Sequence, residues 1–79
     1  MSRVSYIQEK LNRFAIDYGL EFRTWWDKNI QRYIFRFVNR EFKLGYDFSL
    51  SYKEIYTTNP EYLVEFMTNK VKKSNINVF

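Results

Sequence analysis

The chain has 79 residues, a net charge of +4, and neither cysteine nor histidine. These counts exclude disulfides, the common zinc sites, thiol nucleophiles and imidazole bases. A chain of this length buries only roughly 60% of the surface that it exposes when unfolded. Its two Trp, seven Tyr and eight Phe must therefore supply much of the core.

No segment has the composition of a signal peptide or the roughly 20 apolar residues of a membrane span. We therefore expect one domain over residues 1–79, located in the cytoplasm and without a membrane partner. The 13 Lys and Arg outnumber the 9 Asp and Glu. This excess permits an anionic partner without requiring one.

The first segment has the spacing of an amphipathic helix over residues 3–18. Its apolar positions recur every three or four residues and comprise Val4, Ile7, Leu11, Phe14, Ala15 and Tyr18. Ser2 or Ser5 can cap the start of this helix. Gly19 follows the stripe, where a glycine in the left-handed conformation ends a helix at least steric cost.

Three strands are predicted next. Residues 20–26 alternate in the strand sense, and the polar residues 27–29 form a break. Residues 30–50 then predict two strands that fold back on each other around Asn39 and Arg40.

A tight turn at this point fixes the register of the second hairpin. It places Phe37 opposite Phe42, Phe35 opposite Leu44 and Tyr33 opposite Tyr46, so this aromatic side should face the helices.

The C-terminal third predicts one or two helices. Ser51 and Glu54 have the spacing of a capping box that begins a short helix. Thr58 or Asn59 can cap a second helix over about residues 60–73, because Pro60 is accepted in a first turn. Residues 74–79 are either a flexible tail or a short docked segment.

We therefore predict an α+β fold in which a three-stranded antiparallel sheet carries an N-terminal helix and one or two C-terminal helices on one face (α-β-β-β-α-α). Over residues 3–73 this order resembles a double-stranded-RNA-binding domain. That family has a lysine-rich start to its final helix. The corresponding segment here, SYKEIYTTNPEY, contains one lysine, so the RNA-contacting residues of the family have no counterparts.

The opposite face of the predicted sheet carries the candidate partner-binding residues, which are Arg23, Trp25, Arg32, Arg36, Arg40 and Lys43. Arginine binds phosphate in bidentate geometry, and an exposed tryptophan stacks on a base or packs on a protein.

An alternative interpretation is a ladder of ion pairs without a binding role. One predicted register places Glu21 opposite Arg36 and Trp25 opposite Arg32, and the other places Asp47 opposite Arg32 and Arg36 opposite Lys43. Arg23, Arg40 and Lys43 then remain unmatched.

The sequence gives no support for catalysis, a metal site, a cofactor or a small-molecule substrate, because it lacks the usual catalytic side chains and has no glycine-rich phosphate loop. We expect a non-catalytic binding protein with a macromolecular partner, a protein rather than a nucleic acid. The composition resembles that of phage or mobile-element accessory proteins that inhibit or regulate host machinery. The alternatives are a homodimeric scaffold and a direct DNA- or RNA-binding protein.

Overall fold

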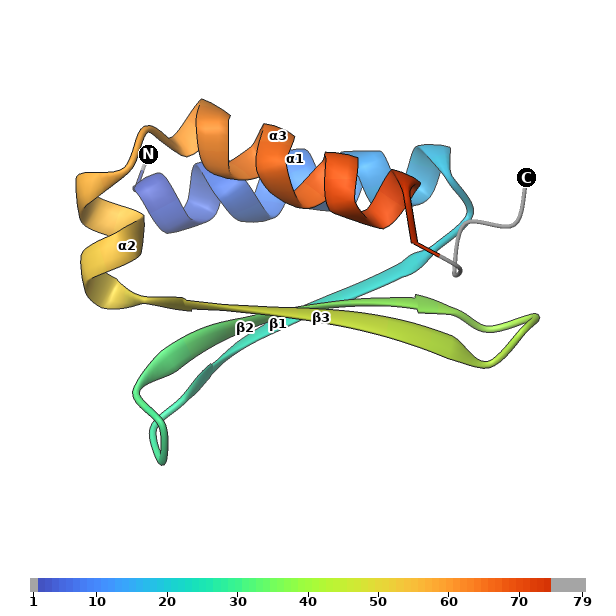
Figure 1. Cartoon of the computed structure of the whole chain (residues 1–79), viewed down its shortest axis with the longest axis horizontal. Coiled ribbons are helices and arrows are strands. Elements are labelled where there is room, and N and C mark those ends of the chain that lie inside the picture. Colours follow the sequence, from blue (N-terminus) through green and yellow to red (C-terminus); the bar gives the residue numbers. More distant parts are fainter. Residues whose placement is uncertain (1, 75–79) are drawn as a thin grey trace.

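A computed structural model describes residues 2–74 of the chain. Its elements are α1 (Arg3–Asp17), β1 (Glu21–Asp27), β2 (Arg32–Asn39), β3 (Leu44–Ser51), α2 (Tyr52–Thr57) and α3 (Pro60–Lys72). The strands form one antiparallel sheet in the order β1-β2-β3, and both long helices cover the same face (Figure 1). The predicted α+β fold and its element order are confirmed. Residues 75–79 of the predicted tail lie outside the described residues.

Both ends of α1 have side-chain or backbone caps. The hydroxyl of Ser2, not that of Ser5, caps the start by accepting the Ser5 N–H at 3.1 Å. At the other end, Gly19 has a φ of 67°, and the Leu20 N–H donates to the Ala15 carbonyl at 2.8 Å. This C-terminal motif turns the chain directly from α1 into β1.

The caps of the later helices agree with the sequence. Ser51 and Glu54 form the complete capping box of α2, with the Glu54 carboxylate accepting the Ser51 N–H at 2.9 Å. Asn59, rather than Thr58, caps α3 by accepting the Glu61 N–H at 2.8 Å.

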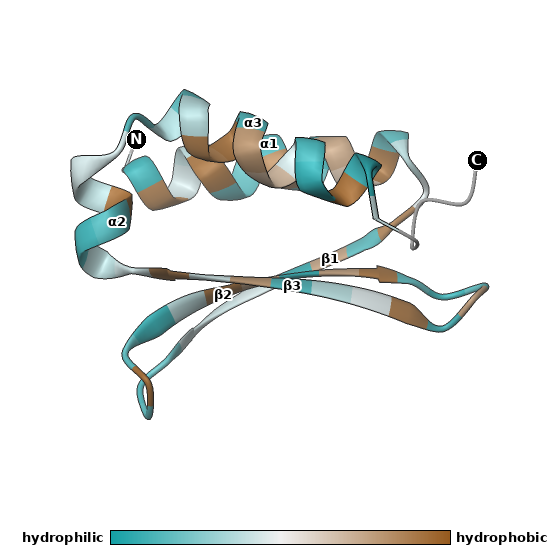
Figure 2. Cartoon of the chain, in the orientation of Figure 1, coloured by the Kyte–Doolittle hydropathy of each residue, from teal (hydrophilic) through white to brown (hydrophobic). Residues whose placement is uncertain are grey.

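The core lies between the helices and the central strand. Phe35 and Phe37 of β2 are fully buried. They lie beneath α1 and α3, along which hydrophobic residues alternate with hydrophilic ones (Figure 2). The other buried apolar residues are Ile7, Leu11, Ala15, Leu20, Leu50, Ile55, Leu63, Met67 and Val71. Truncation of one buried Phe costs about 3–5 kcal/mol, a large part of the stability of a small domain.

The predicted register of the second hairpin is wrong, although the predicted faces are right. Phe35 pairs with Phe48 and Phe37 with Tyr46, so β3 is shifted by four residues from the predicted pairing. The cause is a four-residue loop, 40–43, in place of a tight turn. Phe42, predicted in the strand, lies in this loop and is 50% exposed.

Asn39 explains why the chain does not turn earlier. This residue is buried as the last residue of β2, and its side-chain carbonyl accepts the Phe42 N–H at 3.3 Å. Lys43 closes the loop at a φ of 55°, in the left-handed region that non-glycine residues rarely adopt.

The first hairpin differs in the same way. Its loop spans residues 28–31, so Ile30 is exposed in a turn instead of extending β2. The pairs are Arg23 with Arg36 and Trp25 with Ile34, a shift of two residues from the predicted pairing. Both shifts are even, and an even shift keeps every side chain that remains in a strand on its predicted face.

The two glycines provide a matched test of this backbone. We expect Gly19→Ala to lower the free energy of unfolding by about 1 kcal/mol, because alanine is strained at a φ of 67°. Gly45 lies inside β3, where an added Cβ would meet the Phe37 carbonyl oxygen at an ordinary 3.7 Å. Gly45→Ala should therefore be neutral or stabilising in urea denaturation. Equal losses in both variants would contradict the assigned end of α1.

Candidate functional site

The face of the sheet that carries no helix among the described residues is the candidate site, and we call it the open face. The residues on this face are Glu21, Arg23, Trp25, Asp27, Arg32, Ile34, Arg36, Val38, Gly45, Asp47, Ser49 and Ser51. Arg40 and Lys43 lie in the loop at one end of it. The structure therefore brings the six predicted residues to one face and its rim.

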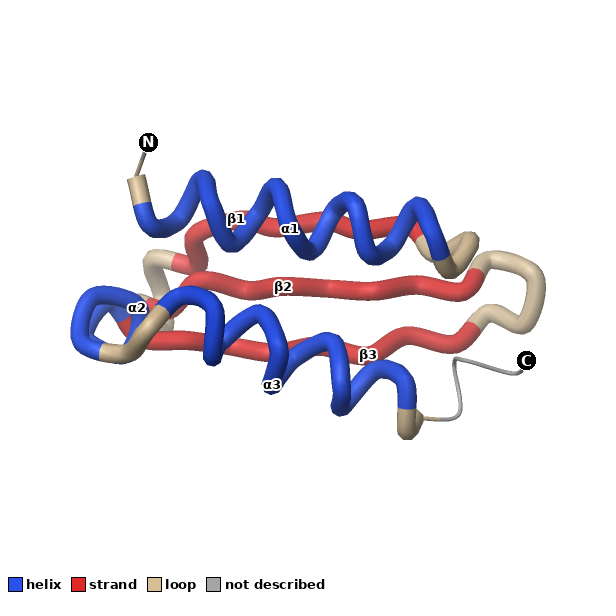
Figure 3. The backbone as a smooth tube through the Cα atoms, turned by 90° about the horizontal axis from the view of Figure 1, so that it is seen from above, coloured by secondary structure: helices blue, strands red, loops and turns tan. Residues whose placement is uncertain are grey.

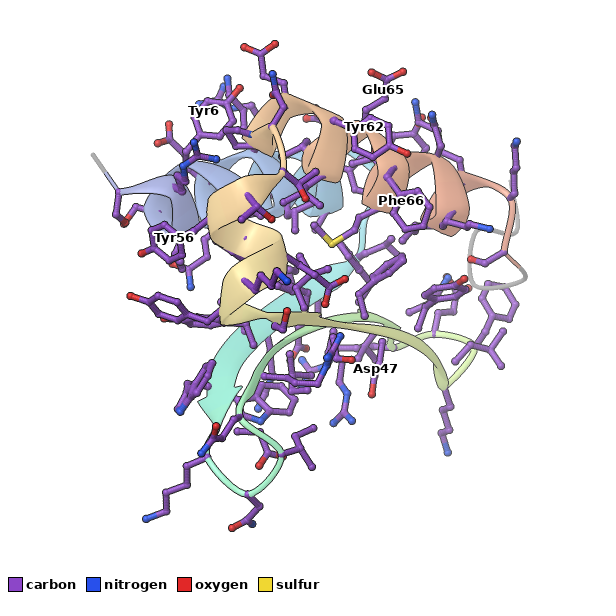
Figure 4. All side chains as sticks on the ribbon, turned by 60° about the vertical axis from the view of Figure 1, so that its left-hand side comes forward. Tyr6, Asp47, Tyr56, Tyr62, Glu65 and Phe66 are labelled. Carbon is purple, nitrogen blue, oxygen red and sulfur yellow. The ribbon has the colours of Figure 1, made fainter. Side chains whose placement is uncertain are left out.

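Arg36 and Asp47 form the centre of the open face (Figure 4 labels Asp47). They are directly paired in register, and the Arg36 guanidinium donates two hydrogen bonds to the carboxylate, at 2.8 and 2.7 Å. Its Cζ also lies 5.2 Å from the centroid of the Trp25 ring. The predicted contacts of Arg36 with Glu21 or Lys43 are wrong, because the loop shifts bring Asp47 and Trp25 to it instead.

Glu21 joins two arginines that the sequence left unmatched. Its carboxylate oxygens lie 2.7 Å from Nε of Arg23 and 2.7 Å from Nε of Arg40. The side chains of both arginines remain largely exposed, at 66% and 79%. Only Lys43 keeps its predicted lack of an ion pair, as far as residues 2–74 are concerned.

Arg32 links the sheet to α2. It donates to the hydroxyl and the carbonyl of Ser49, both at 3.0 Å, and to Glu54 at 2.8 Å. Glu54 also completes the cap of α2. The predicted pairing of Arg32 with Trp25 or Asp47 is wrong, and the contacts of Arg32 indicate a structural role.

A shallow hollow lies at one end of the open face. It is lined by Arg36, Val38, Arg40, Lys43, Leu44, Gly45 and Asp47. Gly45 is paired with Val38 and places no side chain above the strand, which leaves the space open. The hollow therefore has an apolar floor and a charged rim.

The open face, taken together with its two loops, is nearly neutral. With its two loops and Glu54, which contacts Arg32, the open face has six cations beside five carboxylates, and these are Arg23, Lys28, Arg32, Arg36, Arg40, Lys43, Glu21, Asp27, Glu41, Asp47 and Glu54. The excess positive charge lies mainly on the helix side. Across the helices and Lys73, apart from Glu54, seven cations accompany four carboxylates.

An exposed aromatic cluster lies where the sheet meets α2. Trp26 contacts Tyr33 and Tyr52, with ring centroids 4.8 and 6.4 Å apart, and Tyr52 stacks on Tyr56 at 4.5 Å. Trp26 is 41% exposed. Alternation in β1 correctly predicted its face, but it could not show that the helices leave this end of the sheet uncovered.

Within residues 2–74 no three acidic side chains gather to form a metal site. None of the described helices combines the length and apolar character needed to cross a membrane. No family model matches the chain, and searches of curated proteins and of solved structures find no match.

Hydrogen bonds hold three carboxylates, those of Asp47, Glu21 and Glu54, in their charged form. Hydrogen bonds from Arg36 lower the pKa of Asp47 below its usual value, and a hydrogen bond from Arg23 lowers the pKa of Glu21. The Ser51 N–H does the same for the pKa of Glu54. A carboxylate whose pKa is lower in the folded state stabilises that state above its unfolded pKa, and this contribution is lost as pH falls through the folded pKa.

Asp47→Asn tests this linkage. We expect the variant to lose up to about 1 kcal/mol of unfolding free energy near pH 7, because the pair is half exposed. The difference from the parent should shrink as pH falls below about 4. Urea denaturation across this range measures both effects.

Asp17→Asn is the matched control. Asp17 ends α1, where a negative charge opposes the helix dipole, so its removal should not destabilise the protein near neutral pH. A difference between parent and Asp47→Asn that stayed constant from neutral to acidic pH would contradict an electrostatic role for Asp47.

Proposed function

We propose that this chain is a small non-catalytic binding protein whose open face docks on a partner protein. The position of Trp25 carries the proposal. Its side chain is 38% exposed and its ring contacts the guanidinium of Arg36, which also lines the hollow. Trp and Arg are the residues most enriched in binding hot spots. A side chain that is already oriented loses less entropy on binding.

The charge balance favours a protein over a nucleic acid. A phosphate that approached Arg36 or Arg23 would have to compete with Asp47 or Glu21, which already occupy the guanidinium groups. These carboxylates would also repel the phosphate. A protein surface can instead use the paired charges without separating them, by packing on Trp25 and offering polar contacts at the rim.

Binding by occupation of a partner's surface suits an inhibitor or regulator, and a role as a phage-type regulator of host machinery in the cytoplasm stays part of this proposal. A homodimer is the alternative use of the same face, because Ile34 lies half-buried opposite Trp25, and Val38 lies half-buried farther along the same face. Light scattering after size exclusion separates the two, since a dimer that dissociates on Trp25→Ala would favour the alternative.

Trp25 and Trp26 form a matched pair for testing the docking surface. They are neighbours in β1 with similar exposure, 38% and 41%, on opposite faces of the sheet. A partner is first captured from the native host, identified and purified. We expect Trp25→Ala to weaken its affinity by at least about 2 kcal/mol, or roughly 30-fold, in calorimetric titration.

Trp26→Ala should leave that affinity unchanged. Arg40→Glu combined with Lys43→Glu should also abolish capture, because both residues lie at the rim of the hollow. Thermal melts verify that each variant is folded. Full affinity of folded Trp25→Ala, or an equal loss from Trp26→Ala, would show that the partner uses another surface.

A nucleic-acid titration tests the alternative of a direct DNA- or RNA-binding protein. Phosphate neutralisation gives affinity that falls with salt at a slope of about −0.9 per duplex phosphate contacted. We expect labelled DNA and RNA duplexes to show no specific binding at about 50 mM or 200 mM salt. Tight, salt-dependent binding that Arg36→Gln removes would contradict a protein-binding role for the open face.

A further inference from the structure

The outer edge of the sheet at β3 differs from the edge at β1. In Figure 3, α1 runs above β1, whereas α3 crosses β3 and its C-terminal half extends beyond the strand. β3 pairs only with β2 among the described strands, so the backbone groups along its outer edge have no strand partner there. Natural proteins usually protect such an edge, because it is a template for an added strand.

Aromatic side chains lie on α3 above this edge. Tyr62 and Phe66 are 59% and 42% exposed, and their rings stack with centroids 6.4 Å apart (Figure 4). They line a groove with Glu65, Asn69, Lys70 and Lys73, which we call the α3 groove. Tyr46 and Phe48 of β3 are only half-buried against the core. This arrangement leaves apolar surface next to backbone groups of β3 that pair with no described strand.

The charge of the groove is complementary to an acidic ligand. Lys70 and Lys73 line it against one carboxylate, Glu65, which points away from the sheet in Figure 4. Cations at the C-terminal end of a helix also complement its dipole, which explains why lysines are placed there. The dipole does not explain why Tyr62 and Phe66 are exposed beside them.

We propose that β3 and the α3 groove accept an extended acidic segment of a partner protein as a fourth strand. Backbone hydrogen bonds to β3 would supply affinity, as in other cases of strand addition. Alternate side chains of the added strand point toward the helix layer. Apolar ones pack on Phe66 and Tyr62, and acidic ones that follow reach Lys70 and Lys73. This surface is separate from the open face.

The probe is a labelled synthetic peptide with an alternating valine–threonine stretch followed by three glutamates, and the matched control peptide ends in three lysines. We expect only the acidic peptide to bind in fluorescence anisotropy. In the complex, amide hydrogen exchange should slow at alternate residues of β3. Failure of the acidic peptide to bind, or equal binding of both peptides, would overturn the proposal. So would amide exchange that slows at β1, or amide exchange at β3 that the peptide does not change.

Charge reversal identifies the groove. Lys70→Glu with Lys73→Glu should weaken peptide binding about tenfold. If this charge reversal disturbs the folding of α3, Lys70→Gln with Lys73→Gln replaces it, and this milder variant should also weaken binding. Lys10→Glu with Arg13→Glu makes the same change in net charge on α1 and should have no effect beyond about twofold. Equal effects of the α1 and α3 variants would contradict a local site.

Trp25→Ala separates this proposal from the docking of the open face. The variant should bind the acidic peptide with unchanged affinity, because Trp25 lies on β1 and on the other face of the sheet. If Trp25→Ala abolished peptide binding in a folded protein, the peptide would occupy the open face and the fourth-strand proposal would fail.

Discussion

Complete burial of Phe35 and Phe37 is the constraint on which the rest of the structure depends. A chain without disulfides can stabilise this small fold only by removing apolar surface from water, and β2 is the only described strand with a neighbour on both sides. Its two phenylalanines lie beneath both long helices. Successive residues of a strand point to opposite faces, so the burial of these two phenylalanines places Arg36 and Val38 on the open face.

The sequence determines faces much better than it determines register. Alternation of apolar and polar residues has a period of two, so it predicts which side of the sheet each residue occupies. The register depends instead on where each loop begins and ends. Asn39 looks like a turn residue in the sequence, yet the structure buries it in β2 and uses its side chain to hold the following loop.

This difference decided how well the site could be predicted. Residues that remain in the strands were assigned to the correct faces, because an even shift of register preserves parity. Ion-pair partners were wrong, because a shift of two or four residues moves a charge by about 7 to 14 Å along a strand. Local signals were more reliable: the capping box of α2 and the glycine that ends α1 each depend on residues within one turn. Exposure of Trp26 depends on where helices end in space, which no local pattern contains.

Glu54 has a consequence for how the molecule opens. One carboxylate accepts the N–H that caps α2 and the guanidinium of Arg32 on the central strand. When α2 frays, Arg32 of β2 loses its carboxylate partner, Glu54. When the end of β3 opens, α2 loses the cap that Ser51 provides. We infer that α2 and the adjoining ends of β2 and β3 open as one cooperative unit rather than in succession. A helix of six residues, too short to persist alone, would thereby share the lifetime of the sheet.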